Sequence, residues 1–185
     1  DPLDGTSNYL AKLPWFGTMV TLVCKGTPTI GVIALPELNL TYTCLKGAGV
    51  MLNGERVFCN NHVTLQDSLI AVGFDSDTFQ NHSCLLSALQ ALTSQVRGIR
   101  MTNSLYDYSM CMQGSVQAVV NFSTKVWDVA AASLMLAELG FIVSSTSGDP
   151  LNFDVDHIGL YFDCPIVAGT HQAFGCVLEM VKNAG

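Results

Sequence analysis

The chain has 185 residues, of which 49% are apolar and only 12% charged, and its net charge is −7. Its 8 Lys and Arg residues are too few for the clustered basic surface that binds DNA or RNA, which excludes a nucleic acid polymer as partner. No apolar run reaches the ~20 residues of a membrane span, and no basic-then-apolar leader is visible, so we expect a soluble, cytoplasmic protein that does not bind a membrane.

Seven cysteines are scattered at irregular spacing without a C-x-x-C pair. This pattern argues against a disulfide framework and a zinc site, and it favours reduced, mostly buried thiols. The composition shows no linker, repeat or low-complexity tract, so it indicates no domain boundary within residues 1–185.

The first eight residues, Asp-Pro-Leu-Asp-Gly-Thr-Ser-Asn, carry two carboxylates on a proline-stiffened turn. Proline restrains itself and its predecessor, so the chain should leave an extended segment at Asp1 and enter a helical turn near Thr6. Asp1 and Asp4 can then face one point. Mg²⁺ prefers such oxygen ligands, and the N–H groups of Gly5 and Thr6 at a helix start can bind an anion. The alternative interpretation is an Asp N-cap beside an Asx turn.

The rest of the chain mixes strand and helix patterns in an α/β order. Apolar and alternating runs predict strands at 15–23, 29–35, 40–45, 50–52, 68–74, 98–101, 116–122, 141–144 and 155–160. Helical periodicity predicts helices at 78–96, 104–113 and 128–139. Asn53-Gly54 favours a hairpin tip, because both residues tolerate positive φ.

Asp128 lies where a predicted strand delivers the chain to a helix N-terminus. Its side chain could serve as an N-cap or as a partner of the helix dipole. It could equally be a third carboxylate that converges on the point faced by Asp1 and Asp4. The residues alone leave both roles open.

Three motifs, in the same order as in the family, make the chain resemble the inositol monophosphatase family. The opening residues are similar to its D-P-[IL]-D-G-T-x-N-[FY] signature, and Trp127-Asp128 begins a segment like its W-D-x-A-[AG] helix. Between them, a Lys-Gly-Ala-Gly run at 46–49 and Asn53-Gly54 resemble its K-G-x-G and N-G hairpin. The resemblance implies that residues 1–185 are one partial domain, a layered α/β/α/β sandwich of the inositol monophosphatase or sugar phosphatase type that lacks its N-terminal segment. It also implies a strand at 165–169 and a final helix at 171–182.

The resemblance also implies an activity: a Mg²⁺-dependent, lithium-sensitive phosphomonoesterase in which two metals activate water, with Mn²⁺ as an alternative ion. It implies that Asp1 bridges the metals, that Leu3 contributes its backbone carbonyl, and that Asp4 and Asp128 hold the second ion. Gly5 and Thr6 would bind phosphate through backbone N–H groups, and the Thr6 hydroxyl would help to position water. The catalytic set implied is Asp1, Asp4, Thr6 and Asp128.

Substrate binding falls, by the same resemblance, to Asn103, Ser104 and Asn121. Asn103 stands where an R-x-x-G-[ST] segment of the family has a glycine. Asn121 stands where many relatives have an acid that receives substrate hydroxyls, and an amide also donates hydrogen bonds. Asn121 could instead be an ordinary residue at the end of a strand. The substrate expected is a small phosphorylated metabolite, such as an inositol phosphate or a related polyol phosphate.

The resemblance covers the later two thirds of a family member, so we expect the chain alone to be nearly inactive. The alternative is a non-catalytic remnant or a binding or scaffold protein of the same fold. Within the enzyme class, histidinol phosphate, fructose 1,6-bisphosphate and 3′-phosphonucleotides are competing substrates. A homodimer is a further expectation from relatives.

Overall fold

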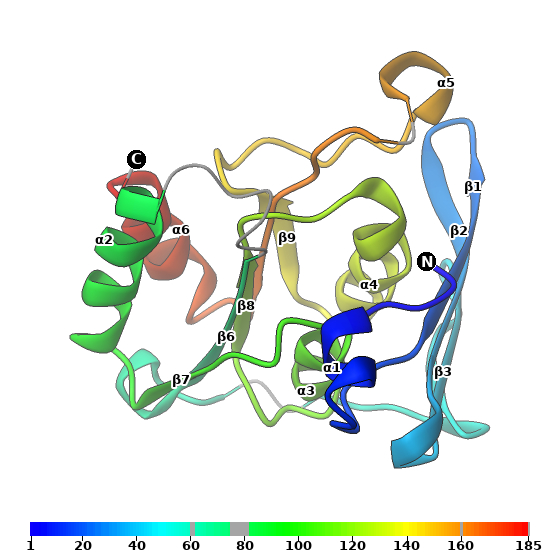
Figure 1. The fold of residues 1–185 in the computed structure, drawn as a ribbon, viewed down its shortest axis with the longest axis horizontal. Helices are drawn as coiled ribbons and strands as arrows, with labels where there is room; N and C mark the ends of the chain where they lie inside the picture. The colour runs from blue at the N-terminus through cyan, green and yellow to red at the C-terminus, as the bar shows by residue number, and fades with distance from the viewer. Residues whose placement is uncertain (60–61, 75–81, 160, 185) are drawn as a thin grey trace.

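A computed structural model describes residues 1–59, 62–74, 82–159 and 161–184. Two sheets and two helical layers alternate across the molecule (Figure 1). One outer layer contains two helices, and the sheet that follows is mixed. A second pair of helices separates it from an antiparallel sheet on the opposite side. This is the α/β/α/β order expected from the sequence.

The antiparallel sheet has the strand order β1-β2-β3-β4-β5 and the mixed sheet the order β7-β6-β8-β10-β9. The strands of the first are β1 (Thr18–Cys24), β2 (Thr27–Leu35), β3 (Leu40–Leu45), β4 (Gly49–Leu52) and β5 (Glu55–Arg56). Those of the second are β6 (Leu69–Gly73), β7 (Gly98–Arg100), β8 (Ala118–Asn121), β9 (Ile142–Ser145) and β10 (Ile166–Gly169). In the mixed sheet, β6 runs parallel to β7 and β8, whereas β10 is antiparallel to both its neighbours.

The helices and short turns complete the layers. They are α1 (Thr6–Leu10), α2 (His82–Thr93), α3 (Tyr106–Met112), α4 (Val126–Glu138), α5 (Val155–Ile158) and α6 (Phe174–Lys182), with 3₁₀ turns η1 (Pro36–Leu38) and η2 (Leu65–Asp67). α2 and α6 pack together outside the mixed sheet, while α3 and α4 lie between the sheets (Figure 1). Within the described chain, none of these helices combines the length and apolar character of a membrane span.

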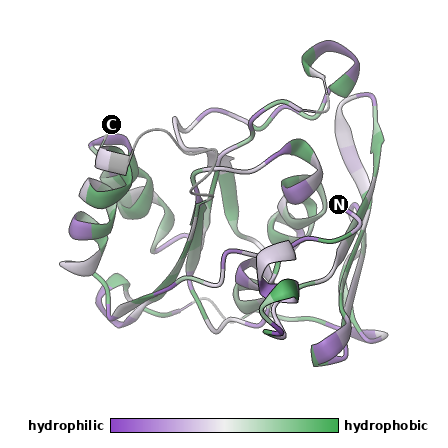
Figure 2. Cartoon of the chain, viewed as in Figure 1, coloured by the Kyte–Doolittle hydropathy of each residue, from purple (hydrophilic) through white to green (hydrophobic). Residues whose placement is uncertain are grey.

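α4 is the central element because it contacts both sheets. Val126 and every residue from 129 to 136 are buried, so the helix has almost no solvent-facing side, as expected of a core helix. Its close approach to β2 occurs at Gly31, where an added Cβ would lie 3.4 Å from the Cα of Ala131. Figure 2 shows hydrophobic residues on much of α4 and on strands of the mixed sheet.

The C-terminal end of α4 is fixed to the antiparallel sheet by Glu138. Its carboxylate accepts hydrogen bonds from the N–H groups of Gly47 at 2.7 Å and Gly49 at 2.9 Å. Both glycines have positive φ, as a tight turn requires. The Lys-Gly-Ala-Gly motif therefore has a structural role: it connects the hairpin to α4.

Most predicted elements are confirmed, but the predicted strand at 155–160 is wrong. Val155–Ile158 form a single helical turn, α5, which ends at Gly159 with φ 78°. Asp154 precedes this turn, and its carboxylate lies 2.8 Å from Nδ1 of His157. The N–H groups of His157 and Ile158 both donate to the Asp154 carbonyl at 3.0 Å, so local backbone bonds replace the ladder that a strand would need. Residue 160 lies outside the described residues.

Smaller differences affect element ends and cysteines. The helix predicted at 171–182 begins only at Phe174, and the one predicted at 128–139 begins earlier, at Val126. The start of the helix predicted at 78–96 falls outside the described residues up to position 81. The cysteine prediction holds only in part, because Cys24 and Cys176 are exposed.

The antiparallel sheet also faces outward, away from α4. Apolar side chains remain exposed there on β1, β2 and β3: Val20, Leu22, Ile30 and Leu45.

At the edge of this sheet the chain start is held by a two-way bridge between Asp4 and Gly17. The Asp4 N–H donates to the Gly17 carbonyl at 2.8 Å, and the Gly17 N–H donates back at 3.1 Å.

Gly17→Ala should destabilise the protein through a clash with β2. A Cβ at this position would lie 1.9 Å from the carbonyl oxygen of Ala34, a backbone atom that cannot turn away. We expect a loss of about 3 kcal/mol in the free energy of unfolding, measured by urea denaturation. The control is Gly175→Ala in α6, where no atom lies within 4 Å of the added Cβ and the helix should gain stability. Equal stabilities of the two variants would contradict the structure around Gly17.

Candidate active site

The first six residues form a turn that points its carboxylates inward. Asp1 accepts a hydrogen bond from the N–H of Leu3 through Oδ1 at 2.7 Å, and Thr6 Oγ1 donates to the Leu3 carbonyl at 3.0 Å. Gly5 has φ 75°, and a Cβ there would lie 2.6 Å from the Trp15 carbonyl oxygen. The turn therefore requires glycine at this position for both conformation and space.

Asp4 joins this turn to the loop before α3. Its Oδ1 accepts a hydrogen bond from the N–H of Leu105 at 2.6 Å. Residues 101 positions apart in the chain thus become neighbours. The carboxylate keeps a fixed orientation because both the backbone of Asp4, through Gly17, and its side chain, through Leu105, are held.

Asp128 reaches the same point from the first turn of α4. Its Oδ2 accepts from the N–H of Lys125 at 2.8 Å, which is the capping bond that satisfies a helix N-terminus. Thr124 Oγ1 lies 3.5 Å from the same oxygen. The two roles left open by the sequence are therefore compatible: one carboxylate caps α4 and also faces the opening turn.

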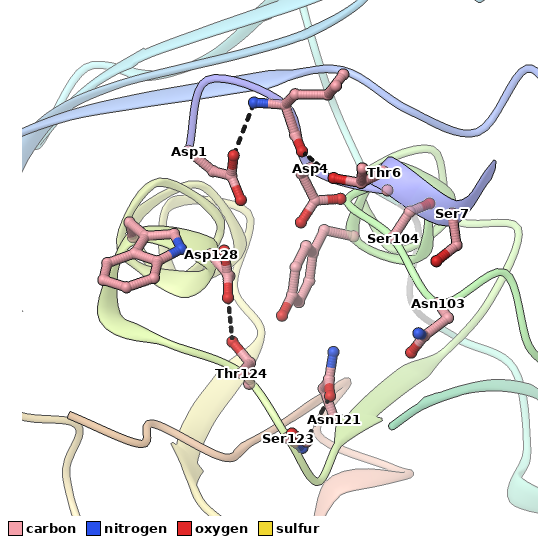
Figure 3. A pocket seen from close by; sticks show the side chains of 14 residues that line it. Asp1, Asp4, Thr6, Ser7, Asn103, Ser104, Asn121, Ser123, Thr124 and Asp128 are labelled. Atoms are coloured by element: carbon pink, nitrogen blue, oxygen red, sulfur yellow. Dashed lines mark hydrogen bonds between the residues drawn. The ribbon is translucent and has the colours of Figure 1, made fainter. Parts of the chain in front are cut away.

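One carboxylate oxygen from each of Asp1, Asp4 and Asp128 lies within 4.8 Å of the others. Figure 3 shows the three side chains pointing toward one another from the opening turn and from α4. Three negative charges at this separation repel one another strongly unless protons or cations neutralise them.

The pKa values reflect this environment. Burial is the main cause that raises the pKa of Asp4 from 3.8 to about 7; the hydrogen bond from Leu105 opposes the shift, and the charge of Asp128 adds to it. Burial also raises the pKa of Asp128, against the hydrogen bond from Lys125. Carboxyl groups with raised pKa values that face one cavity are typical of functional sites.

The carboxylates form one end of a cavity of about 230 Å³. Every residue that the sequence assigned to the site lines it: Asp1, Leu3, Asp4, Gly5, Thr6, Asn103, Ser104, Asn121 and Asp128. They come from the opening turn, the loop before α3, the end of β8 and the start of α4. None of the described lining residues is Lys or Arg, so an anion bound here would need another source of positive charge.

Asn103 and Asn121 face each other across the end of β6 (Figure 3). A Cβ at Gly73 would lie 2.9 Å from Asn121 Nδ2 and 3.3 Å from Asn103 Oδ1, so this glycine makes room for both amides. Asn103 has φ 52°, a left-handed conformation that glycine or asparagine tolerates, and its Oδ1 accepts from the N–H of Phe74. Asn121 Oδ1 accepts from the N–H of Ser123. Each amide oxygen therefore accepts a hydrogen bond from the described backbone.

Five lining residues were not identified from the sequence: Ser7, Tyr108, Ser123, Thr124 and Trp127. Ser7 adjoins the opening motif, and Ser123 and Thr124 lie between two predicted site residues, so their positions gave a signal. Trp127 belongs to the W-D motif, and its ring makes an edge contact with Tyr161, with the ring centroids 5.4 Å apart. Nothing in the sequence indicates that Tyr108 lines the cavity, because its position is an ordinary one on a helix.

The donor set suits a hard divalent cation such as Mg²⁺. It consists of three carboxylates and the nearby Leu3 carbonyl, with no described cysteine or histidine among the lining residues. Next to Asp4, the N–H groups of Gly5 and Thr6 have no hydrogen-bond acceptor among the described residues. The same turn therefore carries both oxygen ligands for a cation and N–H donors for an anion.

Comparisons with known proteins agree with this arrangement. A sequence model described as the inositol monophosphatase family matches residues 1–174. The chain is 35% identical to "Nus factor SuhB" of Xylella fastidiosa, over 100% of this chain and 67% of that protein. It is 27% identical to "Fructose-1,6-bisphosphatase/inositol-1-monophosphatase" of Aquifex aeolicus, over 99% of this chain and 66% of that protein.

A solved structure of extragenic suppressor protein suhB from Bartonella henselae superposes with a TM-score of 0.86 at 27% identity. The superposition covers 98% of this chain and 68% of that one. The chain therefore spans about two thirds of the length of these relatives. The family match over 174 of 185 residues, together with the shared fold, shows that this chain belongs to the inositol monophosphatase family.

Proposed function

We propose that the protein is a Mg²⁺-dependent phosphomonoesterase that acts on a small phosphorylated metabolite. The observation that carries this proposal is the convergence of Asp1, Asp4 and Asp128 within 4.8 Å, in a cavity that supplies no basic side chain from its described lining residues. Divalent cations would neutralise the carboxylates of such a site and supply the positive charge that an anionic ligand needs. Membership of a phosphatase family supports the same activity.

Divalent cations at this site would activate the attacking water and stabilise the charge that develops on the phosphoryl and leaving oxygens. We assign the cation ligands to Asp1, Asp4, Asp128 and the Leu3 carbonyl. Gly5 and Thr6 also line the cavity, and we assign their N–H groups to the phosphoryl oxygens. The Thr6 hydroxyl donates to the Leu3 carbonyl, so its lone pairs remain available to orient a water molecule.

The other end of the cavity would hold the part of the substrate that carries the phosphate. Amides and hydroxyls line it: Ser7, Asn103, Ser104, Asn121 and Ser123 (Figure 3). Side chains of this kind both donate and accept, which suits a hydroxylated substrate such as a polyol or sugar phosphate. The cavity volume of about 230 Å³ favours a small molecule.

A second candidate function is binding of a macromolecular partner with or without catalysis. It is favoured by the name "Nus factor SuhB" that the 35% identical relative carries, since this name does not describe a hydrolase. The two candidates differ in what the carboxylates do. In a purely binding protein, the three aspartates could be replaced without loss of function.

Asp4→Asn and Asp128→Asn in the full-length protein should each abolish Mg²⁺-dependent release of phosphate. Each amide can still accept the backbone hydrogen bond from Leu105 or Lys125, so the fold should persist while a cation ligand is lost. Removing a residue that only hydrogen-bonds to a metal ligand usually lowers metal affinity or activity about 10–100-fold. For a ligand itself we expect the rate of phosphate release to fall by about 100-fold or more. Phosphate release from a panel of phosphomonoesters gives the rates.

The control is Asp156→Asn, which removes an exposed carboxylate on α5 and should keep wild-type turnover. Circular dichroism spectra of all three variants should match that of the wild type. Undiminished turnover in Asp4→Asn or Asp128→Asn would refute the assigned chemistry.

Mg²⁺ binding should weaken as the pH falls through about 7. The pKa of Asp4 is raised to about 7, so below that pH a cation must displace a proton, at a cost on the order of tenfold in affinity per pH unit. The stability of the metal-free protein changes with pH in the opposite direction. Its native state holds the Asp4 proton more tightly than the unfolded chain does. Asp4 therefore lowers the free energy of unfolding as the pH rises from about 4 to about 7. Mg²⁺ should therefore raise the melting temperature more at pH 8 than at pH 5.5. An increase that is equal at both pH values would contradict the raised pKa.

A further inference from the structure

The hydroxyl of Tyr108 is an unused polar group at the active-site cavity. Tyr108 lies on α3 and is only 2% exposed, and its ring packs in the core between the two sheets. It nevertheless lines the cavity that contains the three aspartates. Among the described residues, its Oη has no hydrogen-bond partner.

A buried hydroxyl without a partner is costly, because it has given up its hydrogen bonds to water. Native proteins rarely keep such a group unless a ligand, an ion or a bound water molecule satisfies it. Tyr42 shows the usual solution in the same core. Its hydroxyl lies 2.9 Å from Ser109 Oγ and accepts from Gln113 Nε2 at 2.8 Å.

The surroundings of Tyr108 indicate what kind of partner fits. Burial raises the pKa of its phenol well above 10, and the nearby charges of Asp128 and Asp4 add to this shift. The hydroxyl therefore keeps its proton and can act as a donor. Asp128 and Asp4 are close enough to influence it electrostatically, but neither is a hydrogen-bond acceptor for it.

We propose that Tyr108 forms a hydrogen bond with the ligand held by Asp1, Asp4 and Asp128. Its partner is either a phosphoryl oxygen, which accepts from the hydroxyl, or a water molecule that hydrates the bound cation and donates to it. Both would lie at the carboxylate end of the cavity. Tyr108 is then a ligand-binding residue that the family motifs in this chain do not include. The inference rests on the proposed function, because that function supplies the cation and the phosphate.

The test compares Tyr108→Phe with wild type and with Tyr42→Phe, all as full-length protein at pH 8. Calorimetry first measures the affinity for Mg²⁺ alone, and then the affinity for inorganic phosphate at saturating Mg²⁺. Tyr108→Phe should weaken one of these affinities by about tenfold, since a hydrogen bond to a charged or polarised group is lost. Loss in the Mg²⁺ titration identifies hydration water as the partner of the Tyr108 hydroxyl, and loss in the phosphate titration alone identifies the phosphoryl group. Tyr42→Phe should change neither affinity.

A second readout uses the melting temperature without ligand. Tyr108→Phe removes an unpartnered hydroxyl and keeps the ring, so the metal-free protein should melt at the same temperature as wild type or higher. Tyr42→Phe should melt lower, because it breaks two hydrogen bonds in the core. A purely structural hydroxyl at Tyr108, satisfied by a buried water, would give the opposite pattern: a lower melting temperature and unchanged affinities.

Affinities of Tyr108→Phe within twofold of wild type in both titrations would overturn the proposal. A different result would show that the proposed function itself is wrong. In that case the wild-type protein itself would bind neither Mg²⁺ nor phosphate, and both conclusions would fall together.

Discussion

Repulsion among three carboxylates is the constraint on which this structure depends. Asp1, Asp4 and Asp128 place oxygens within 4.8 Å of one another, although burial already disfavours the charged forms of Asp4 and Asp128. Such an arrangement persists only where the scaffold holds each group in place, and it is stabilised by any cation that binds there. Much of the framework around the cavity serves this purpose.

Two rigid attachments hold the carboxylates. The opening turn is fastened to the antiparallel sheet by the bridge between Asp4 and Gly17, and to the loop before α3 by the bond between Asp4 and Leu105. α4 is buried between both sheets, and Glu138 fixes its far end. A helix held in this way presents Asp128 at a constant position, which is the rigidity that a binding site for cations requires.

The sequence was sufficient for the layers, for the motifs and for the residues that meet in the cavity, because local patterns and a family resemblance encode them. The sequence did not predict the helical turn within 155–160, where backbone bonds to the Asp154 carbonyl close a turn that apolar alternation does not reveal. Tyr108 was missed for another reason. Whether a buried hydroxyl has a partner depends on residues that are distant in sequence, as the contrast with Tyr42 shows. Neither periodicity nor motif spacing contains that information.

We propose that the three aspartates hold divalent cations. The most direct measurement is anomalous diffraction from crystals of the full-length protein soaked in Mn²⁺ at pH 8, where Asp4 is ionised. We expect anomalous density between Asp1, Asp4 and Asp128, within ligand distance of their carboxylate oxygens. A difference map with no density there, from crystals in which these side chains are well ordered, would contradict it.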